Sequence, residues 1–385
     1  MIKLVKEQIF SIDEIEKEQI ISTIKSYSDD DFLTLYKLCQ LHDLAHIVFM
    51  ALEDLNIILP EKIKSLFYSD NLRAIVRQER LQFAYNQLVE ILRTEKIEFV
   101  PLKGIVIRNL YPKAYYRTSC DIDVLVDKEK IDQILSILTE KYHYKRYTGS
   151  EYDVMLIAEN GEHIELHYGL DLRYKGEKIN RITDNLFSDL ILDSDGEYEK
   201  KFKSEFFFFY FVEHMAKHFI EGGCGVRSFI DLMLLKSIDG FESQEGIQLI
   251  KECNLLSFYQ NAVRTCEVWF GGEQANEFTN SIEKYVIIGG AYGSFDNKVK
   301  VEQNRRGGKF KYFLSRIFLP YRVLKYQFPI LKKHKWLFPF MQVARWFKRI
   351  FEGRTKTTLY EFTLNTSLTK QEIKETENMI DELGL

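Results

Sequence analysis

The feature that most constrains this chain is a short segment with two aspartates, Asp121-Ile-Asp-Val-Leu-Val126. It alternates polar and apolar residues at its start and then becomes apolar, which predicts a β-strand with one exposed end. Because side chains alternate between the two faces of a strand, Asp121 and Asp123 must project from the same face. Two close carboxylates repel each other unless a cation lies between them. Since Mg²⁺ binds through one or two carboxylates and keeps positions open for substrate phosphates, the pair is a candidate metal and phosphate site.

A third carboxylate follows about forty residues later. The segment Gly161-Glu-His-Ile-Glu-Leu-His-Tyr168 predicts a second strand after a glycine turn. A period of two places His163, Glu165 and His167 on one face of that strand. If the two strands are neighbours, Glu165 completes an acidic trio able to hold two divalent ions.

Residues upstream of the aspartates suit a polyphosphate. Lys103-Gly104 lies between apolar segments at 97–100 and 105–110, which predicts a junction between a strand and a helix. Amides at a helix start bind phosphate, and Arg117 adds charge-assisted hydrogen bonds. The alternatives are that Lys103 is an ordinary surface lysine and that Arg117 forms a structural ion pair with one of the aspartates.

The order and spacing of these motifs carry a resemblance. Pro-Leu-Lys-Gly, Tyr-Pro, Arg, Asp-Ile-Asp-Val-Leu-Val and Ile-Glu-Leu-His together resemble the uncharacterised nucleotidyltransferase family of the DNA polymerase beta-like superfamily, and the similarity extends through 206–235 and 326–340. The resemblance implies that Asp121 and Asp123 are the metal-binding pair and that Glu165 is the third acidic residue. It also implies Lys103-Gly104 as the nucleotide-binding turn, Mg²⁺ or Mn²⁺ as cofactor and an NTP as substrate. The chain departs from the superfamily pattern after Gly104, where Ile105 replaces a serine or a second glycine.

Four histidines accompany these residues, namely His163, His167, His214 and His218. His163 and His167 lack the helical His-Glu-x-x-His spacing of zinc sites, so we expect them beside the metal ligands or in structural roles. His214 and His218 are spaced i, i+4 and share one face of a helix. We expect them to form buried hydrogen bonds or to help line the nucleotide cleft.

Periodicity divides the chain into four regions around an α+β core. These are an N-terminal helical region (1–96), a nucleotidyltransferase-like core with a mixed sheet (97–175), a helical domain (176–290) and a basic, aromatic-rich helical tail (291–385). Ser28 and Pro60 predict helix starts in the first region. Within the third we expect a turn at 193–196 and a buried pair between Asp231 and Arg227, four residues earlier. A further amphipathic helix is expected near 370–383.

The net charge of −4 hides an asymmetry. Residues 298–349 hold fifteen Lys or Arg and one acid, Glu302, so the tail carries about +14 and the remainder about −18. Twelve aromatic residues lie between Phe310 and Phe347. One interpretation is a helical tail that packs its aromatics inward and its cations against the acidic body. The others are contact with an anionic membrane surface and, less favoured, with nucleic acid.

Compartment and function follow as expectations. The longest apolar run, 206–212, is too short to cross a bilayer, and the N-terminus lacks a signal peptide's apolar region. Five cysteines without metal-ligand spacing suit free thiols, so we expect a cytoplasmic protein, peripheral to the inner membrane face if the tail binds it. The expected activity transfers an NMP group from an NTP to a hydroxyl or phosphate acceptor. The alternative is a non-catalytic nucleotide-binding or membrane-surface accessory protein that retains the fold.

Overall fold

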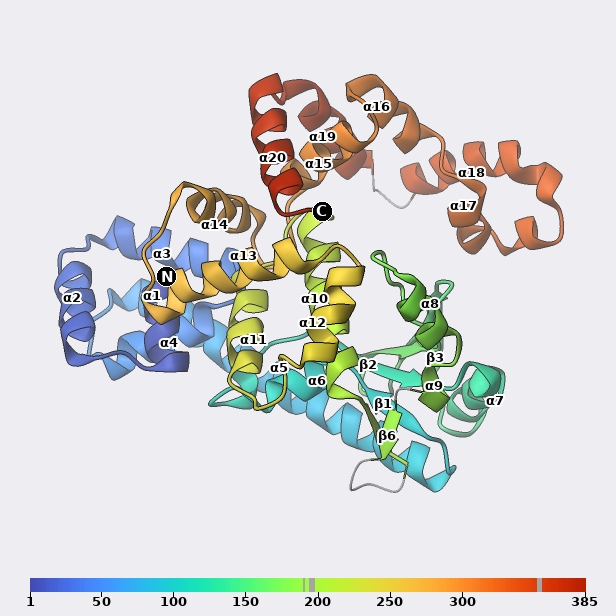
Figure 1. The fold of residues 1–385 in the computed structure, drawn as a ribbon, viewed down its shortest axis with the longest axis horizontal. Helices are drawn as coiled ribbons and strands as arrows, with labels where there is room; N and C mark the ends of the chain where they lie inside the picture. Colours follow the sequence, from blue (N-terminus) through green and yellow to red (C-terminus); the bar gives the residue numbers. More distant parts are fainter. Residues whose placement is uncertain (190, 194–197, 352–354) are drawn as a thin grey trace.

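The computed structural model describes residues 1–189, 191–193, 198–351 and 355–385. Helices dominate these ranges and surround one mixed five-stranded sheet (Figure 1), so the predicted α+β class is confirmed. Among the described helices, none combines the length and apolarity needed to cross a bilayer. All five cysteines are free thiols, and only Cys120 is exposed.

Five helices precede the sheet, as predicted for residues 1–96. They are α1 (Ile2–Phe10), α2 (Glu14–Lys25), α3 (Asp29–Leu41), α4 (Ala45–Asp54) and α5 (Glu61–Thr94). Ser28 starts α3 through reciprocal hydrogen bonds with Asp31, which satisfy two amides that a helix start leaves unpaired. The long helix α5 begins after Pro60 and buries Leu88 in the same cluster as Val124 of the sheet. Helix α5 therefore packs against the sheet.

The N-terminal helices also hold the loop that leads into the aspartate strand. On α4, the Nε2 of buried His46 donates to the carbonyl oxygen of Tyr116 at 3.1 Å. Just before α4, Asp43 accepts a hydrogen bond from the Thr118 hydroxyl at 2.6 Å. These two contacts lie on either side of Arg117 and fix its backbone.

His46 should make stability depend on pH. Burial lowers its pKa from 6.5 to about 4. The unfolded chain therefore takes up a proton below pH 6.5 while the folded chain does not, and the free energy of unfolding falls as the pH drops through this window. When the pH is lowered from about 7.5 to about 5, we expect the free energy of unfolding to fall by about 2 kcal/mol more in wild type than in His46→Gln. Urea unfolding at both pH values measures the difference, and equal losses would contradict it.

The sheet has the strand order β1-β2-β5-β4-β3. Its strands are β1 (Phe99–Pro101), β2 (Asp121–Val126), β3 (Lys145–Gly149), β4 (Asp153–Ile157) and β5 (His163–His167). β2 and β5 run parallel, whereas the other neighbours are antiparallel. Between β1 and β2 lie α6 (Lys103–Arg108) and η1 (Ala114–Tyr116), and after β2 come η2 (Lys128–Lys130), α7 (Ile131–Ser136) and η3 (Ile137–Lys141). A mixed sheet within 97–175 was predicted, and the structure confirms it.

The two faces of the sheet differ in polarity. On one face, apolar side chains of β2 and β5 are buried in a cluster with α5 and α7, among them Ile122, Val124, Ile164 and Leu166. Because side chains alternate, the acidic residues of both strands lie on the opposite face. The acidic side chains on that face are therefore available to bind a cation or a polar ligand.

The region after the sheet is helical, apart from a small two-stranded sheet. Its elements are α8 (Glu177–Asp184), α9 (Leu186–Asp189), β6 (Ile191–Asp193), β7 (Lys200–Phe202), α10 (Ser204–Ile220), α11 (Val226–Lys236), α12 (Gln244–Glu252), α13 (Leu256–Cys266), η4 (Glu267–Gly271) and α14 (Glu277–Gly289). The turn predicted at 193–196 falls mainly on residues 194–196, outside the described residues.

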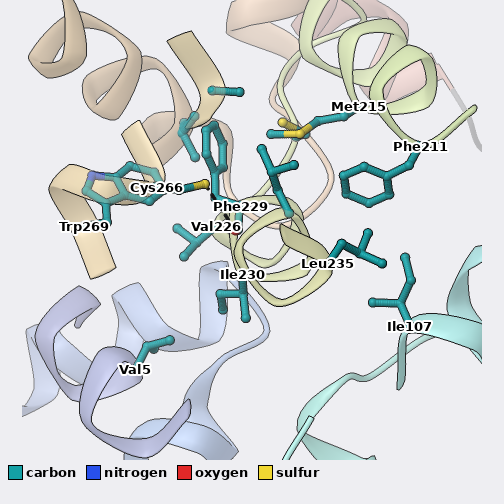
Figure 2. Packing of buried hydrophobic residues seen from close by; sticks show 14 of the residues in the cluster. Val5, Ile107, Phe211, Met215, Val226, Phe229, Ile230, Leu235, Cys266 and Trp269 are labelled. Atoms are coloured by element: carbon teal, nitrogen blue, oxygen red, sulfur yellow. Dashed lines mark hydrogen bonds between the residues drawn. The ribbon is translucent and has the colours of Figure 1, made fainter. Parts of the chain in front are cut away.

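Helix α11 lies in a core that joins the N-terminal helices to the helical region. Figure 2 shows Phe229 beside Cys266 and Trp269, with Ile230 on the side of α11 that faces Val5 of α1. The ring centroids of Phe229 and Trp269 lie 4.8 Å apart. Because one cluster joins these regions, the four-region division of the chain stays a prediction.

The tail consists of helices and short turns. These are α15 (Phe295–Arg305), α16 (Lys309–Ile317), α17 (Tyr321–Gln327), η5 (Pro329–Lys332), η6 (Lys335–Leu337), α18 (Phe338–Phe351), α19 (Thr355–Ser367) and α20 (Lys370–Glu382). α20 confirms the helix expected near 370–383. Helices α15, α16, α19 and α20 pack together, whereas α17 and α18 extend away from the sheet and the helical region (Figure 1).

A glycine-rich loop joins the tail to the body. Gly293 has φ +79°, and a Cβ there would lie 2.7 Å from the carbonyl carbon of Gly222. No other residue type fits this position without movement of the backbone. The close packing of the two loops fixes Tyr292 at the edge of the site described next.

Candidate metal and nucleotide site

The polar face of the sheet carries the predicted acidic residues. On β2, Asp121 and Asp123 alternate with buried Ile122. The parallel register of β2 and β5 places Glu165 directly beside Asp123. The expectation that the two strands are neighbours is therefore confirmed, and neighbouring strands are close enough for their side chains to share one ligand.

Asp123, Glu165 and His167 form a group with the chemistry of a cation site. Each offers one ligand atom, and the three atoms lie within 4.8 Å of one another. His167 Nε2 lies 3.1 Å from Asp123 Oδ1 and 3.6 Å from Glu165 Oε2. Carboxylate oxygens suit Mg²⁺ and Mn²⁺, so the two carboxylates of this group fit a divalent ion.

The sequence predicted that His167 lies beside the metal ligands or has a structural role, and the structure places its Nε2 within hydrogen-bond distance of Asp123. Asp121 lines the same cavity next to this group. His163 is on the same face of β5 but is exposed at the strand start and lies outside the cavity lining. The assignment of Asp121, Asp123 and Glu165 as the ligands stays a prediction.

The charges in this group depend on one another. Burial raises the pKa of Asp121 to about 7, and repulsion from Asp123 and Glu165 acts in the same direction. Burial also opposes ionisation of Asp123, but the hydrogen bond and charge of His167 outweigh it and hold the pKa of Asp123 below its usual value. For His167, burial opposes protonation, yet the hydrogen bonds to Asp123 and Glu165 raise its pKa to about 9. Protonated His167 thus balances part of the negative charge that a divalent cation would neutralise.

The acidic group opens into a cavity of about 470 Å³, a size typical of small-molecule sites. Lys103 and Gly104 line this cavity from the start of α6. The sequence predicted a strand-to-helix junction at this position, and the structure confirms it. The ammonium nitrogen of Lys103 lies 4.4 Å from the centroid of the Tyr210 ring. Burial lowers the pKa of Lys103 to about 7. A Cβ at Gly104 would lie 3.2 Å from Nη1 of Arg117, so the glycine permits the close approach of that guanidinium.

Arg117 lines the cavity and also forms a buried ion pair with Asp231 of α11. Its Nε and Nη2 donate to Oδ1 and Oδ2 of Asp231 at 3.0 and 2.8 Å. The hydroxyl of Tyr111 donates to the same carboxylate at 2.7 Å. Arg117 is therefore ion-paired, as one alternative held, but with Asp231 rather than with an aspartate of β2.

The predicted pair between Arg227 and Asp231 was wrong. Arg227 donates to the carbonyl oxygen of Thr118 at 2.6 Å, and its Nη1 lies 3.5 Å from Asp43 Oδ2. Arg227 and Asp231 share one face of α11, but they do not pair with each other. Arg227 binds Thr118 and Asp231 binds Arg117, so both contact the loop before β2. Arg117 presents two parallel N–H groups to Asp231, a geometry that favours this partner over a residue one turn away.

Helix α10 forms the wall opposite the sheet. The Nε2 atoms of His214 and His218 lie 2.8 Å apart, so one ring donates to the other. Burial lowers the pKa of His218 to about 4 and that of His214 well below its ordinary value. Both rings line the cavity as uncharged groups at neutral pH.

Sequence reasoning missed several residues that line the cavity, among them Tyr210, Glu213, Lys217 and Tyr292. The first three lie on α10 within one turn of His214, so helical spacing around that histidine could have found them. Glu213 accepts hydrogen bonds from the amides of Arg173 and Tyr174 at 2.6 and 3.3 Å. Tyr292 reaches the cavity from the glycine-rich loop and places its ring centroid 5.7 Å from the Arg227 guanidinium carbon. No local pattern indicates that position.

One comparison with known proteins assigns the chain to a family. The family described as "Uncharacterised nucleotidyltransferase" matches residues 28–271, which include β1 to β5, α10 and α11. No curated protein and no solved structure matches the chain. The tail segment 326–340 lies outside the matched range, so its resemblance to the family stays a prediction. Since the match covers more than half of the chain and contains the whole acidic group, this protein belongs to the uncharacterised nucleotidyltransferase family.

Proposed function

We propose that this protein is a metal-dependent nucleotidyltransferase that moves an NMP group from an NTP to a hydroxyl or phosphate acceptor and releases pyrophosphate. Membership of the family supports nucleotidyl transfer. One observation carries the rest of the proposal, namely the parallel register that brings Asp123 beside Glu165, with Asp121 in the same cavity.

The residues of the site divide into two functions. Asp121, Asp123 and Glu165 would hold Mg²⁺ or Mn²⁺. When bound, two such ions would activate the attacking oxygen and stabilise the leaving oxygen of an in-line displacement. Arg117 and the protonated form of Lys103 border the acidic group with positive charge and, with the backbone at Gly104, would bind the triphosphate. Phosphoryl transfer asks little covalent chemistry of a protein, so positioning and charge neutralisation would supply most of the rate.

The histidines would support these groups. His167 hydrogen-bonds Asp123 and orients it, as residues next to a metal ligand commonly do. His214 and His218 would line the acceptor side of the cavity, opposite the sheet, whereas His163 is too exposed for such a role. An NTP donor and an exposed free thiol at Cys120 suit the cytoplasm, which we propose as the compartment.

Calorimetric titration with each of the four NTPs tests the proposal. In the presence of Mg²⁺ we expect one NTP to bind wild type with micromolar affinity, about −8 kcal/mol. The variant Asp121→Asn/Asp123→Asn should lose that heat, because it lacks the two charges that hold the cation. Omitting Mg²⁺ should have the same effect on wild type.

A matched control removes two acids near the same strand but outside the cavity. Glu129 and Asp132 are exposed residues that follow β2, so Glu129→Gln/Asp132→Asn should bind the NTP as wild type does. If no NTP binds, or if the Asp121→Asn/Asp123→Asn variant binds equally well, the acidic group is not a nucleotide site. The alternative of a protein that retains the fold without catalysis would then take its place.

A further inference from the structure

Helix α18 faces its apolar side outward. Phe340, Val343, Phe347 and Ile350 are spaced three, four and three residues apart, so they form one stripe along the helix. Their exposed fractions are 62%, 56%, 58% and 56%. A helix that packed on a protein core would bury such a stripe.

The opposite side of α18 is polar and buried. Gln342 donates to the carbonyl oxygen of Leu319 at 2.5 Å and accepts from the Leu319 amide at 3.3 Å. Arg345 donates to the carbonyl oxygens of Arg316 and Ile317 at 3.0 and 2.6 Å. These hydrogen bonds attach α18 to the segment between α16 and α17 through its polar face, which fixes the apolar stripe toward solvent.

The stripe belongs to a larger exposed surface. We call residues 309–351, from α16 to α18, the arm. Phe310, Phe318 and Trp336 of the arm expose 72%, 61% and 69% of their area. The arm carries eleven Lys or Arg and no Asp or Glu. These three aromatic side chains are therefore not packed into the body, and the first interpretation of the tail does not hold for them.

We propose that the arm docks on an anionic lipid bilayer surface, with the α18 stripe inserted at the level of the headgroups. An amphipathic helix with an apolar face and basic residues around it binds membranes in this way, and exposed aromatic side chains favour the interface. Lys332, Lys333 and Lys335 lie in the exposed turn just before α18, where they would meet lipid phosphates.

The same surface fits other partners less well. Nucleic acid binding by a basic, aromatic surface depends on rings that stack on bases, but much of this surface is aliphatic, including Val343 and Ile350. A second copy of the chain would bring two arms of the same strong positive charge together, and these would repel each other. An anionic bilayer satisfies both the charge and the apolar stripe. This inference does not depend on the proposed transfer activity.

Co-sedimentation of the full chain with vesicles tests the proposal. We expect the protein to sediment with phosphatidylcholine vesicles that contain phosphatidylglycerol. With phosphatidylcholine alone the partition coefficient should be at least about a hundredfold lower, because several lysines would lose their lipid phosphate partners. High salt should weaken the binding for the same reason.

Two variants separate the apolar from the basic contribution. Phe340→Ser/Phe347→Ser/Ile350→Ser should lower partitioning into anionic vesicles by roughly a hundredfold or more, because it removes the inserted side chains. Lys332→Gln/Lys333→Gln/Lys335→Gln should lower it by roughly a hundredfold. The matched control Ile15→Ser/Ile58→Ser/Phe83→Ser removes equally exposed apolar residues from the body, with exposed fractions of 70%, 92% and 56%, and should bind as wild type does.

The outcomes are distinct. All variants should keep the circular dichroism spectrum and NTP binding of wild type, since none changes a residue of the cavity. Wild-type partitioning of both arm variants would overturn the proposal. It would equally be overturned if wild type bound RNA or duplex DNA but not vesicles, or if the stripe variant lost a dimer seen by analytical ultracentrifugation while vesicle binding was absent.

Discussion

Replacing Asp123 by asparagine is expected to lower the rate of nucleotidyl transfer by about 10²–10³-fold, the cost of removing a central electrostatic stabiliser. Asp123 lies beside Glu165 and accepts a hydrogen bond from His167 at 3.1 Å. The amide keeps the shape of the side chain but loses the charge that attracts the cation. Protonated His167 would then face fewer negative charges and would oppose entry of the cation. Pyrophosphate release and label transfer from an NTP labelled at its α-phosphate measure the rate.

A matched substitution shows whether the loss is specific to the site. Glu129→Gln removes one exposed acid shortly after β2, outside the cavity, and should keep the wild-type rate. The Asp123→Asn variant loses the ion pair with His167, so circular dichroism must show that it is folded before the rates are compared. A wild-type rate in Asp123→Asn would remove the acidic group from catalysis, whatever the affinity for NTP.

Much of the fold could be predicted because it follows from local periodicity. Alternation fixed the common face of Asp121 and Asp123, and it did so without any tertiary information. The acidic trio was predicted on the condition that the two strands are neighbours, and the structure shows that β2 and β5 are paired. Helix starts at Ser28 and Pro60 were also predictable, since capping chemistry is local.

The contacts that complete the cavity could not be predicted from the sequence. Arg117 and Asp231 are 114 residues apart, and the nearer candidate, Arg227, satisfied every local rule. The partners of Arg227 are Thr118 and Asp43, which come from other parts of the chain that meet only in the folded protein. Likewise, the position of Tyr292 depends on the packing of two glycine-rich loops. Pairings of this kind depend on tertiary geometry, which periodicity does not contain.

Replacing Asp231 by asparagine is expected to lower the free energy of unfolding by about 3–5 kcal/mol, the cost of leaving one buried charge without its partner. The side chains of Arg117 and Asp231 expose only 11% and 6% of their area. Tyr111 also loses its charged acceptor. Denaturant unfolding measures the change. As a matched control, Glu177→Gln breaks the ion pair between Glu177 and Arg181, whose side chains are 92% and 80% exposed, respectively. This substitution should lower the free energy of unfolding by less than about 0.5 kcal/mol. A cost that small for Asp231→Asn would contradict the prediction.

The double variant Arg117→Met/Asp231→Leu separates the structural role of Arg117 from its role in binding. It leaves no unpaired buried charge, so it should recover most of the stability lost in Asp231→Asn. If the guanidinium also contacts the triphosphate, the stable double variant should still bind the NTP roughly tenfold or more weakly, since a hydrogen bond to a charged group contributes about 1.5–3 kcal/mol. Wild-type affinity would instead show that Arg117 only holds the loop before β2. Lys103, which lines the cavity from the start of α6, would then be the residue that binds the triphosphate.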